Sequence, residues 1–202
     1  MLTLGVTGGI GSGKTALVRH LAEKPGVRAI LADDLAKRLM VEDGAVRAAL
    51  VDRFGPEVYA ADGSLDRAAL AARVFSDPAE LAALNAIVHP AVRRALVEAQ
   101  AAARADGVRL LVYEAALLVE TGGAKVVDHV AVVDAPVETR VERAMARDGA
   151  TREAVLARLS KQIDPAEARA AADTVVENGG TLAELRAQAD ALYERLVAGS
   201  PG

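Results

Sequence analysis

The sequence predicts an α/β fold, in which a parallel five-stranded sheet carries helices on both faces. Three observations predict it. Short apolar runs with the pattern of buried strands occur at residues 2–6, 27–31, 109–113, 129–134 and 174–176. Helical patterns separate these runs, and such alternation is typical of parallel sheets. A glycine-rich stretch then joins the first strand to the first helix.

Composition bounds the possible functions. The 202 residues suffice for one sizeable domain with a small inserted subdomain. The chain has no cysteine, which excludes disulfides, thiolate catalysis and cysteine metal sites. The net charge of −4 argues against a general nucleic-acid binder. We expect no membrane span and no obligatory protein partner, and a cytoplasmic location, because the first strand begins without an apolar leader.

The stretch after the first strand matches the phosphate-binding pattern G-x-x-x-x-G-K-[S/T] at residues 8–15. Gly8, Gly11 and Gly13 allow tight turns that bring backbone N–H groups against a polyphosphate. Lys14 can reach the β- and γ-phosphates, and the Thr15 hydroxyl can bind Mg²⁺. The helix predicted at 14–23 directs its positive dipole end at the phosphate. The pattern therefore predicts a nucleoside triphosphate site.

The interval between the second and third strands is long and predicted to be helical. Helices are expected at residues 45–54, 66–75, 78–88 and 90–104, after a short segment at 35–41. Gly55-Pro56, Asp62-Gly63 and Ser76-Asp77-Pro78 punctuate them, and His89-Pro90 marks a further helix boundary. This interval predicts a helical insertion that is large enough to hold a substrate.

The C-terminal half contributes further helices. A charged pair is predicted at 137–147 and 152–163, with Thr151 as the N-cap of its second helix. The last helix is expected at 182–197, and residues 199–202 are expected to fray.

Polar residues follow several strands at the sheet edge where ligands bind in such folds. These are Thr7, Asp33-Asp34, Glu114 and Asp134. Asp33 could accept a proton from an attacking hydroxyl or hold Mg²⁺ through water, but it could equally cap the following helix. Asp134 precedes Ala135-Pro136 and is expected to be a cap.

Arg140, Arg143 and Arg147 recur on one predicted helix face. Guanidinium groups there could neutralise a transferred phosphoryl group, and the alternative is a solvated face paired with Glu138 and Glu142. His89, a lone histidine, is more consistent with a structural role than with catalysis.

Together these features resemble the dephospho-coenzyme A kinase family over nearly the whole chain. The matching segments are Val6–Lys14, Ala32-Asp33 with Ala36, Val74–Pro78, Leu84–Pro90, Leu117–Glu120, Arg143, Arg147-Asp148, Gln162, Ala172-Asp173 and Asn178-Gly179. The T-G-G-I-G-S-G-K form of the loop and the L-N-A-I-V-H-P stretch are the most particular of them.

The resemblance implies ATP-dependent phosphorylation of the ribose 3′-hydroxyl of dephospho-CoA, with Mg²⁺. It implies a P-loop NTPase-like core at 1–33, 108–138 and 172–200, a CoA-binding insertion at 34–107 and a lid at about 139–165. It also implies roles for individual residues. The catalytic residues would be Asp33 as general base, Lys14 and the lid arginine Arg143. The ATP-binding residues would be Gly9, Gly11, Ser12, Gly13, Lys14, Thr15, Ala16, Arg147 and Asn178, with Thr15 also on the metal. The acceptor-binding residues would be Thr7, Gly8, Asp33, His89 and Leu117.

Four positions depart from the family pattern. Leu31 replaces a common Asp, so one carboxylate is missing near Asp33. Ala16 replaces a common Thr, and Glu114 with Ala116 replaces Asp and Pro. We expect these last changes to be tolerated.

The alternative functions are a nucleoside or nucleotide kinase and a non-catalytic nucleotide-binding regulator. The L-N-A-I-V-H-P stretch disfavours the kinase alternative, while Asp33 and the arginines disfavour the regulator.

Overall fold

The computed structural model describes residues 1–74 and 77–198. The chain divides into two compact units. The sheet unit comprises Met1–Leu31 and the chain from Gln100 onwards, and the helical unit comprises Ala32–Ala99. Phe75, Ser76 and the C-terminal residues from 199 lie outside the described residues, and so do the sequence predictions that fall on them.

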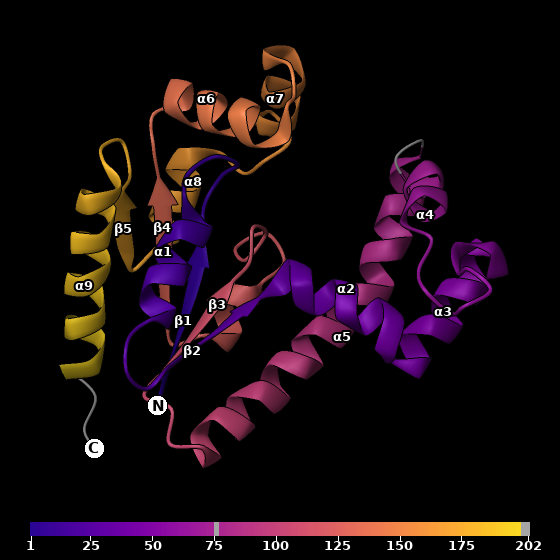
Figure 1. The fold of residues 1–202 in the computed structure, drawn as a ribbon, viewed down its shortest axis with the longest axis horizontal. Coiled ribbons are helices and arrows are strands. Elements are labelled where there is room, and N and C mark those ends of the chain that lie inside the picture. The colour runs from indigo at the N-terminus through magenta and orange to yellow at the C-terminus, as the bar shows by residue number, and fades with distance from the viewer. Residues whose placement is uncertain (75–76, 199–202) are drawn as a thin grey trace. The chain divides into compact units, whose positions relative to one another are not determined.

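The sheet unit contains the five-stranded parallel sheet that the sequence predicts (Figure 1). Its strands are β1 Leu2–Thr7, β2 Val27–Leu31, β3 Leu110–Glu114, β4 His129–Asp134 and β5 Thr174–Glu177. Their order is β2-β3-β1-β4-β5, so β1 lies between β3 and β4 in the centre. The register pairs Val6 with both Glu114 and Ala131, which brings the carboxyl ends of these three strands together. This edge is where ligands bind in open α/β sheets.

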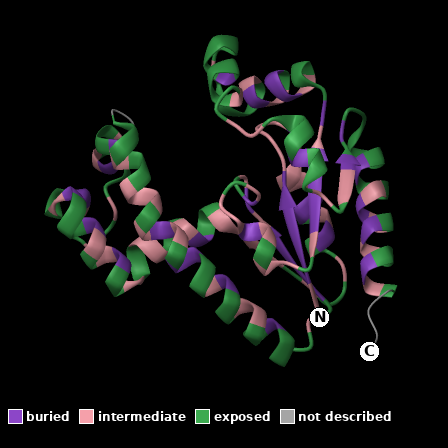
Figure 2. Ribbon diagram, turned by 180° about the vertical axis from the view of Figure 1, so that it is seen from behind, coloured by how far each residue is buried: buried purple, intermediate pink, exposed green. Residues whose placement is uncertain are grey.

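Helices cover both faces of this sheet. The helices that lie wholly in this unit are α1 Lys14–Ala22, α6 Val137–Asp148, α7 Arg152–Leu159, α8 Pro165–Ala170 and α9 Leu182–Ala198, with a 3₁₀ turn, η2, at Gly123–Val126. On one face α1 and α9 pack together over Leu4, Val6 and Val112, and Leu17 and Leu192 are almost fully buried there. On the other face Gln100 donates to the Thr3 hydroxyl at 3.2 Å. Figure 2 shows buried residues along the strands and exposed ones on the outer sides of the helices.

The helical unit has a core of its own. Its elements are α2 Ala32–Glu42, α3 Gly44–Phe54, the 3₁₀ turn η1 Pro56–Val58, α4 Arg67–Val74 and most of α5, which spans Pro78–Ala105. One apolar cluster joins them: Val46, Leu50, Phe54, Val58, Leu70, Val74 and Ala91. Asp43 caps α3 by accepting from the backbone of Ala45 and Val46.

The structure differs from the expected elements at α5, α2, α7 and α8. α5 is a single helix of 28 residues with Pro90 inside it, where a break at His89-Pro90 was predicted. Proline removes one backbone hydrogen bond, but Val88, Ala91 and Val92 are buried around it, so packing holds the turns on either side together. α2 begins at Ala32, so Asp33 and Asp34 lie in its first turn and not at its N-cap. α7 ends at Leu159, and the following chain forms the unpredicted α8, which Pro165 starts at its first position.

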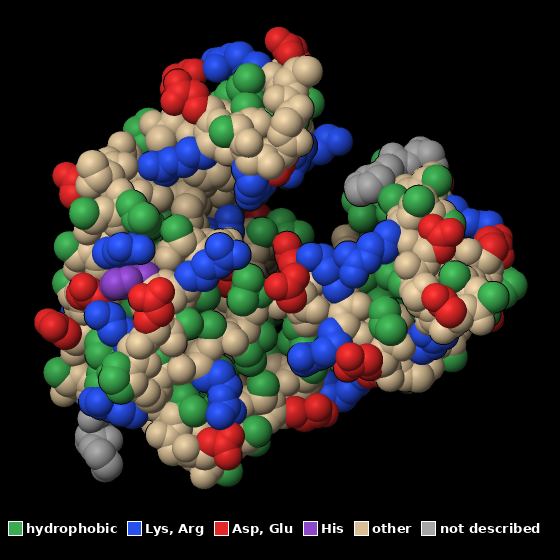
Figure 3. Space-filling view, in the orientation of Figure 1, with side chains coloured by type: hydrophobic (Ala, Val, Ile, Leu, Met, Phe, Trp, Pro, Cys, Tyr) green, Lys and Arg blue, Asp and Glu red, His purple; other side chains and the backbone are tan. Residues whose placement is uncertain are grey.

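Two further findings concern membrane-spanning helices and surface charge. No helix within the described residues is long and apolar enough to cross a membrane. On the face that Figure 3 shows, Lys and Arg side chains are interspersed with Asp and Glu.

Candidate phosphate-transfer site

The loop between β1 and α1 has the turned backbone that its glycines predict. Gly8, Gly11 and Gly13 have φ of 142°, 75° and 98°, in a region that side chains disfavour. Gly13 is the N-cap of α1, and its carbonyl accepts from the N–H groups of Ala16 and Leu17. This loop therefore leads directly into a helix N-terminus, where the helix dipole attracts anions.

The side chains of Lys14 and Thr15 have different partners: Lys14 bonds to the start of the loop, and Thr15 to the end of β3. The Lys14 ammonium donates to the carbonyls of Gly8 at 2.7 Å and Gly9 at 3.1 Å. The Thr15 hydroxyl donates to Glu114 Oε1 at 3.0 Å. The cation is therefore placed at the start of the loop, and a hydroxyl–carboxylate pair at its end.

The Thr15–Glu114 pair has the chemistry of a magnesium site. Hydroxyl and carboxylate oxygens suit Mg²⁺, which usually takes one or two protein ligands besides phosphates and water. The described residues contain no group of three or more His, Cys, Asp or Glu that could hold a metal. A site completed by a nucleotide's phosphates therefore fits these residues. From the sequence, Glu114 was placed at this edge of the sheet, because it ends β3 beside β1, but it was assigned no role in metal binding.

Arg140 and Gln162 hold the outer side of the loop. Arg140 is only 5% exposed, and its Nε donates to the Ile10 carbonyl at 3.1 Å. Gln162 Oε1 accepts from the Ile10 N–H at 2.9 Å and from Arg140 Nη2 at 3.3 Å. A Cβ on Gly9 would collide with the Arg140 guanidinium, and one on Gly11 with the Arg140 backbone. These two glycines therefore make room for α6 as well as for a ligand.

Asn178 holds the loop from the β5 side. Its side chain is buried and donates to the Ser12 carbonyl at 2.7 Å. Arg143 in turn donates to the carbonyls of Asn178 at 2.9 Å and Gly180 at 3.3 Å. Of the residues assigned to the site from the sequence, Arg143 and Asn178 thus lie together beside the phosphate loop.

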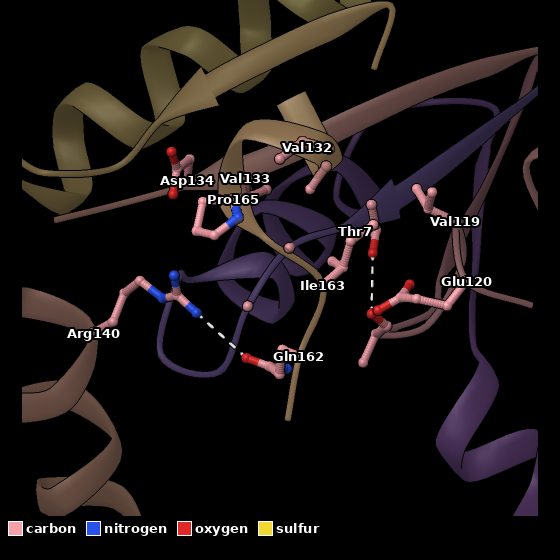
Figure 4. A pocket seen from close by; sticks show the side chains of 14 residues that line it. Thr7, Val119, Glu120, Val132, Val133, Asp134, Arg140, Gln162, Ile163 and Pro165 are labelled. Atoms are coloured by element: carbon pink, nitrogen blue, oxygen red, sulfur yellow. Dashed lines mark hydrogen bonds between the residues drawn. The ribbon is translucent and has the colours of Figure 1, made fainter. Parts of the chain in front are cut away.

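A pocket opens beside the first residues of the loop (Figure 4). The carboxyl ends of β1 and β4 form its floor through Thr7, Gly8 and Val132–Asp134, and Arg140 and Gln162 point toward one another at its side. The Thr7 hydroxyl is turned to the Ala116 carbonyl at 3.2 Å. Thr7 and Gly8, both assigned to the acceptor, therefore line one pocket next to the loop.

Of the other assigned residues, Arg147 and Leu117 lie outside the loop, whereas Ala16 follows it directly in α1. Arg147 on α6 forms a bidentate salt bridge with Asp148, and Asp148 also accepts from Arg158. These guanidinium groups hold the pKa of Asp148 well below its usual range. Leu117 is 42% exposed, and Ala16 packs against the core of the sheet unit.

Asp33 and His89 belong to the helical unit. Asp33 is exposed in the first turn of α2. His89 is half-buried in α5, and burial lowers its pKa, so the imidazole is neutral at neutral pH.

The prediction for Asp134 is wrong, and one reading that the sequence left open is now decided. Asp134 is not a helix cap: its carboxylate accepts from Arg169 at 2.8 Å and from the N–H of Ala135, and the N-cap of α6 is Pro136. The solvated arginine face is also wrong for Arg140 and Arg143, because both donate to backbone carbonyls and Glu138 pairs with Arg152. Thr151 does cap α7, as predicted.

Known proteins resemble this chain along its whole length. The family model described as dephospho-CoA kinase matches residues 2–184. The dephospho-CoA kinase of Salinibacter ruber is 47% identical over 98% of this chain and 100% of its own length. The crystal structure of TT1252 from Thermus thermophilus has a TM-score of 0.77 at 42% identity, covering 96% of this chain and 97% of that one.

The fold is shared more widely. A dephospho-CoA kinase from Campylobacter jejuni, 24% identical, matches 98% of both chains with a TM-score of 0.66, which shows the common fold. With the glycine loop, the parallel sheet and matches of this extent, the chain belongs to the dephospho-CoA kinase family.

Proposed function

We propose that this protein transfers the γ-phosphate of ATP to the ribose 3′-hydroxyl of dephospho-CoA, giving CoA and ADP. The observation that carries this proposal is the match to dephospho-CoA kinases across both units, 47% identical over 98% of the chain, with the phosphate loop intact. A nucleotide site alone would not name an acceptor. The match extends through the helical unit, and that supports the acceptor.

The donor half of the site is built by the loop. Its N–H groups and Lys14 would hold the β- and γ-phosphates, and Thr15 with Glu114 would hold Mg²⁺. Mg²⁺ supplies charge neutralisation for the phosphate oxygens. Gly9, Gly11, Ser12, Gly13 and Ala16 line the same turn, and Asn178 supports it from below while contacting the adenine side of ATP.

The acceptor half needs a base and a binding surface. We assign the base to Asp33, which is exposed and therefore able to meet a ligand. The 3′-oxygen attacks the γ-phosphorus, its proton passes to the Asp33 carboxylate, and the bond from the γ-phosphorus to the β–γ bridging oxygen breaks to release ADP. Thr7, Gly8, His89 and Leu117 would contact dephospho-CoA.

The remaining parts have roles within this scheme. The insertion at 34–107 would bind CoA, the core would comprise 1–33, 108–138 and 172–200, and the segment at about 139–165 would be the lid. Arg143 and Arg147 would then neutralise charge on the transferred group. Closure of this lid over the bound substrates would exclude water, which competes with the 3′-hydroxyl as a nucleophile for the γ-phosphate. The proposal places the reaction in the cytoplasm, where ATP is available. It includes no binding partner beyond ATP and dephospho-CoA.

A panel of acceptors tests the acceptor's identity. The enzyme is incubated with MgATP and dephospho-CoA, adenosine, AMP or shikimate, and ADP release and product mass are measured. We expect dephospho-CoA to be consumed fastest, with a single phosphate added at the 3′ position. A faster reaction with adenosine or AMP would favour a nucleoside or nucleotide kinase instead.

A further inference from the structure

Arg140 is a buried cation whose hydrogen bonds go to neutral oxygens. The side chain is 5% exposed, and its partners are the Ile10 carbonyl and the Gln162 amide oxygen. Asp134 exerts an electrostatic pull on it, but that carboxylate is hydrogen-bonded to Arg169 at 2.8 Å. Burying a guanidinium on neutral acceptors costs free energy, so a simple packing role explains Arg140 poorly.

Gln162 closes a three-membered ring of hydrogen bonds with Arg140 and Ile10. Its Oε1 accepts from Arg140 Nη2 at 3.3 Å (Figure 4) and from the Ile10 N–H at 2.9 Å. Arg140 comes from the first turn of α6, and Gln162 from the segment between α7 and α8. Ile10 therefore has both its backbone N–H and its carbonyl held by side chains more than a hundred residues away.

This ring holds two successive peptide units of the phosphate loop, one through the Ile10 N–H and the next through the Ile10 carbonyl. The Ile10 N–H is taken by Gln162, and the Ser12 N–H donates to the Gly9 carbonyl at 3.2 Å, so a phosphate would be received by other N–H groups of the loop, among them that of Gly11. The next residue, Gly11, has φ of 75° and packs against the Arg140 backbone. The ring thus supports the loop at the point where its backbone turns toward the ligand.

We propose that Arg140 and Gln162 are positioning residues, which brace the phosphate loop at Ile10 in the shape that receives the β-phosphate, and that the charge of Arg140 adds to the attraction for the polyphosphate. The proposal rests on the donor half of the proposed function and does not depend on the identity of the acceptor. Preorganisation of this kind strengthens binding, because the loop is already ordered and binding does not have to offset the entropy cost of ordering it.

The test measures MgADP binding by calorimetry in the full-length protein, without any acceptor. Arg140→Met and Gln162→Leu should each raise the dissociation constant about tenfold, as expected for losing a charge-assisted bond or its partner. The double variant should bind hardly more weakly than Arg140→Met, because both side chains act through Ile10 and the charge is already lost in that single variant. The matched control is Arg28→Met. Arg28 is an exposed arginine on β2 that pairs with Asp106, and its loss should leave the dissociation constant for MgADP unchanged.

A rescue variant separates positioning from folding. Gln162→Glu keeps an oxygen that can accept from Ile10 and Arg140, so MgADP binding should be closer to that of the parent than to that of Gln162→Leu. In turnover assays the KM for ATP should rise while the KM for dephospho-CoA stays constant.

Three results would each overturn the proposal. They are parent-like MgADP binding in Arg140→Met and Gln162→Leu, additive losses in the double variant, and Gln162→Glu binding as weakly as Gln162→Leu. If dephospho-CoA were not phosphorylated while the binding pattern held, only the proposed acceptor would fail.

Discussion

The sheet unit and the helical unit prepare their ligands by different means. In the sheet unit the phosphate loop offers backbone groups, and buried side chains such as Arg140 and Asn178 hold that backbone from outside. In the helical unit the candidate residues Asp33 and His89 are side chains on helices, one exposed and one half-buried. A backbone site depends on local turns, whereas a side-chain site depends on how helices pack. The two halves of the reaction should therefore respond differently to substitution.

The largest effect is expected from Asp33→Asn, in the helical unit. Removing a general base should lower kcat by about 10²–10⁴, while MgADP binding, which belongs to the sheet unit, should stay unchanged. Stopped assays for CoA and calorimetry for MgADP measure the two quantities. Asp34→Asn is the matched control, because Asp34 is the next residue and pairs with Lys37 at 3.0 Å. Near-normal turnover in Asp33→Asn would remove this residue from the base role.

Lys14→Ala tests the sheet unit in the same way. Losing this cation should lower kcat on the order of 10²–10³, as for other groups that stabilise transition-state charge, and here MgADP binding should weaken too. The control is Lys24→Ala. Lys24 follows the end of α1, and its ammonium pairs with Asp190 in the middle of α9 at 2.6 Å. If Lys14→Ala bound MgADP normally and turned over normally, the loop would not be the phosphate site.

Core substitutions should show whether the two units respond separately. Leu50 in the helical unit and Leu192 in the sheet unit are both almost fully buried, so each change to Ala should cost about 2–5 kcal/mol of stability. Hydrogen exchange should show lost protection within residues 32–99 for Leu50→Ala and within the sheet unit for Leu192→Ala. Dephospho-CoA binding should weaken more than MgADP binding in Leu50→Ala. Equal loss of protection in both units would contradict this separation.

The smallest effect concerns the helix pair of the proposed lid. Thr151→Val removes the hydroxyl that accepts from the Ala154 N–H at 3.3 Å, and losing such a cap should cost about 1 kcal/mol in urea unfolding. Ser160→Ala, which removes a hydroxyl bonded to the Ala157 carbonyl at the other end of α7, should cost less. A Thr151→Val protein as stable as the parent would show that the α7 cap does not limit stability.

Sequence reasoning succeeded where a pattern is local. All five strands were predicted within one residue at either end, because β-branched and leucine-rich runs bounded by turn residues carry their own signal. The glycine loop was also predicted, since positive φ at Gly8, Gly11 and Gly13 follows from residue type. It failed at Pro90, where burial on both sides of the proline outweighs the local breaking tendency. It also failed for α8, a short helix that Asp164 caps.

The sequence by itself determined the parallel α/β class, the phosphate loop and the family to which the chain belongs. Only the tertiary structure decided what surrounds the loop: Glu114 on Thr15, Arg140 and Gln162 on Ile10, and Asn178 on Ser12. A tight turn is set by the few residues that form it, so it can be predicted along the chain. These side-chain contacts join residues about a hundred or more positions apart, and they exist because the strand order brings the ends of β1, β3, β4 and β5 to one edge.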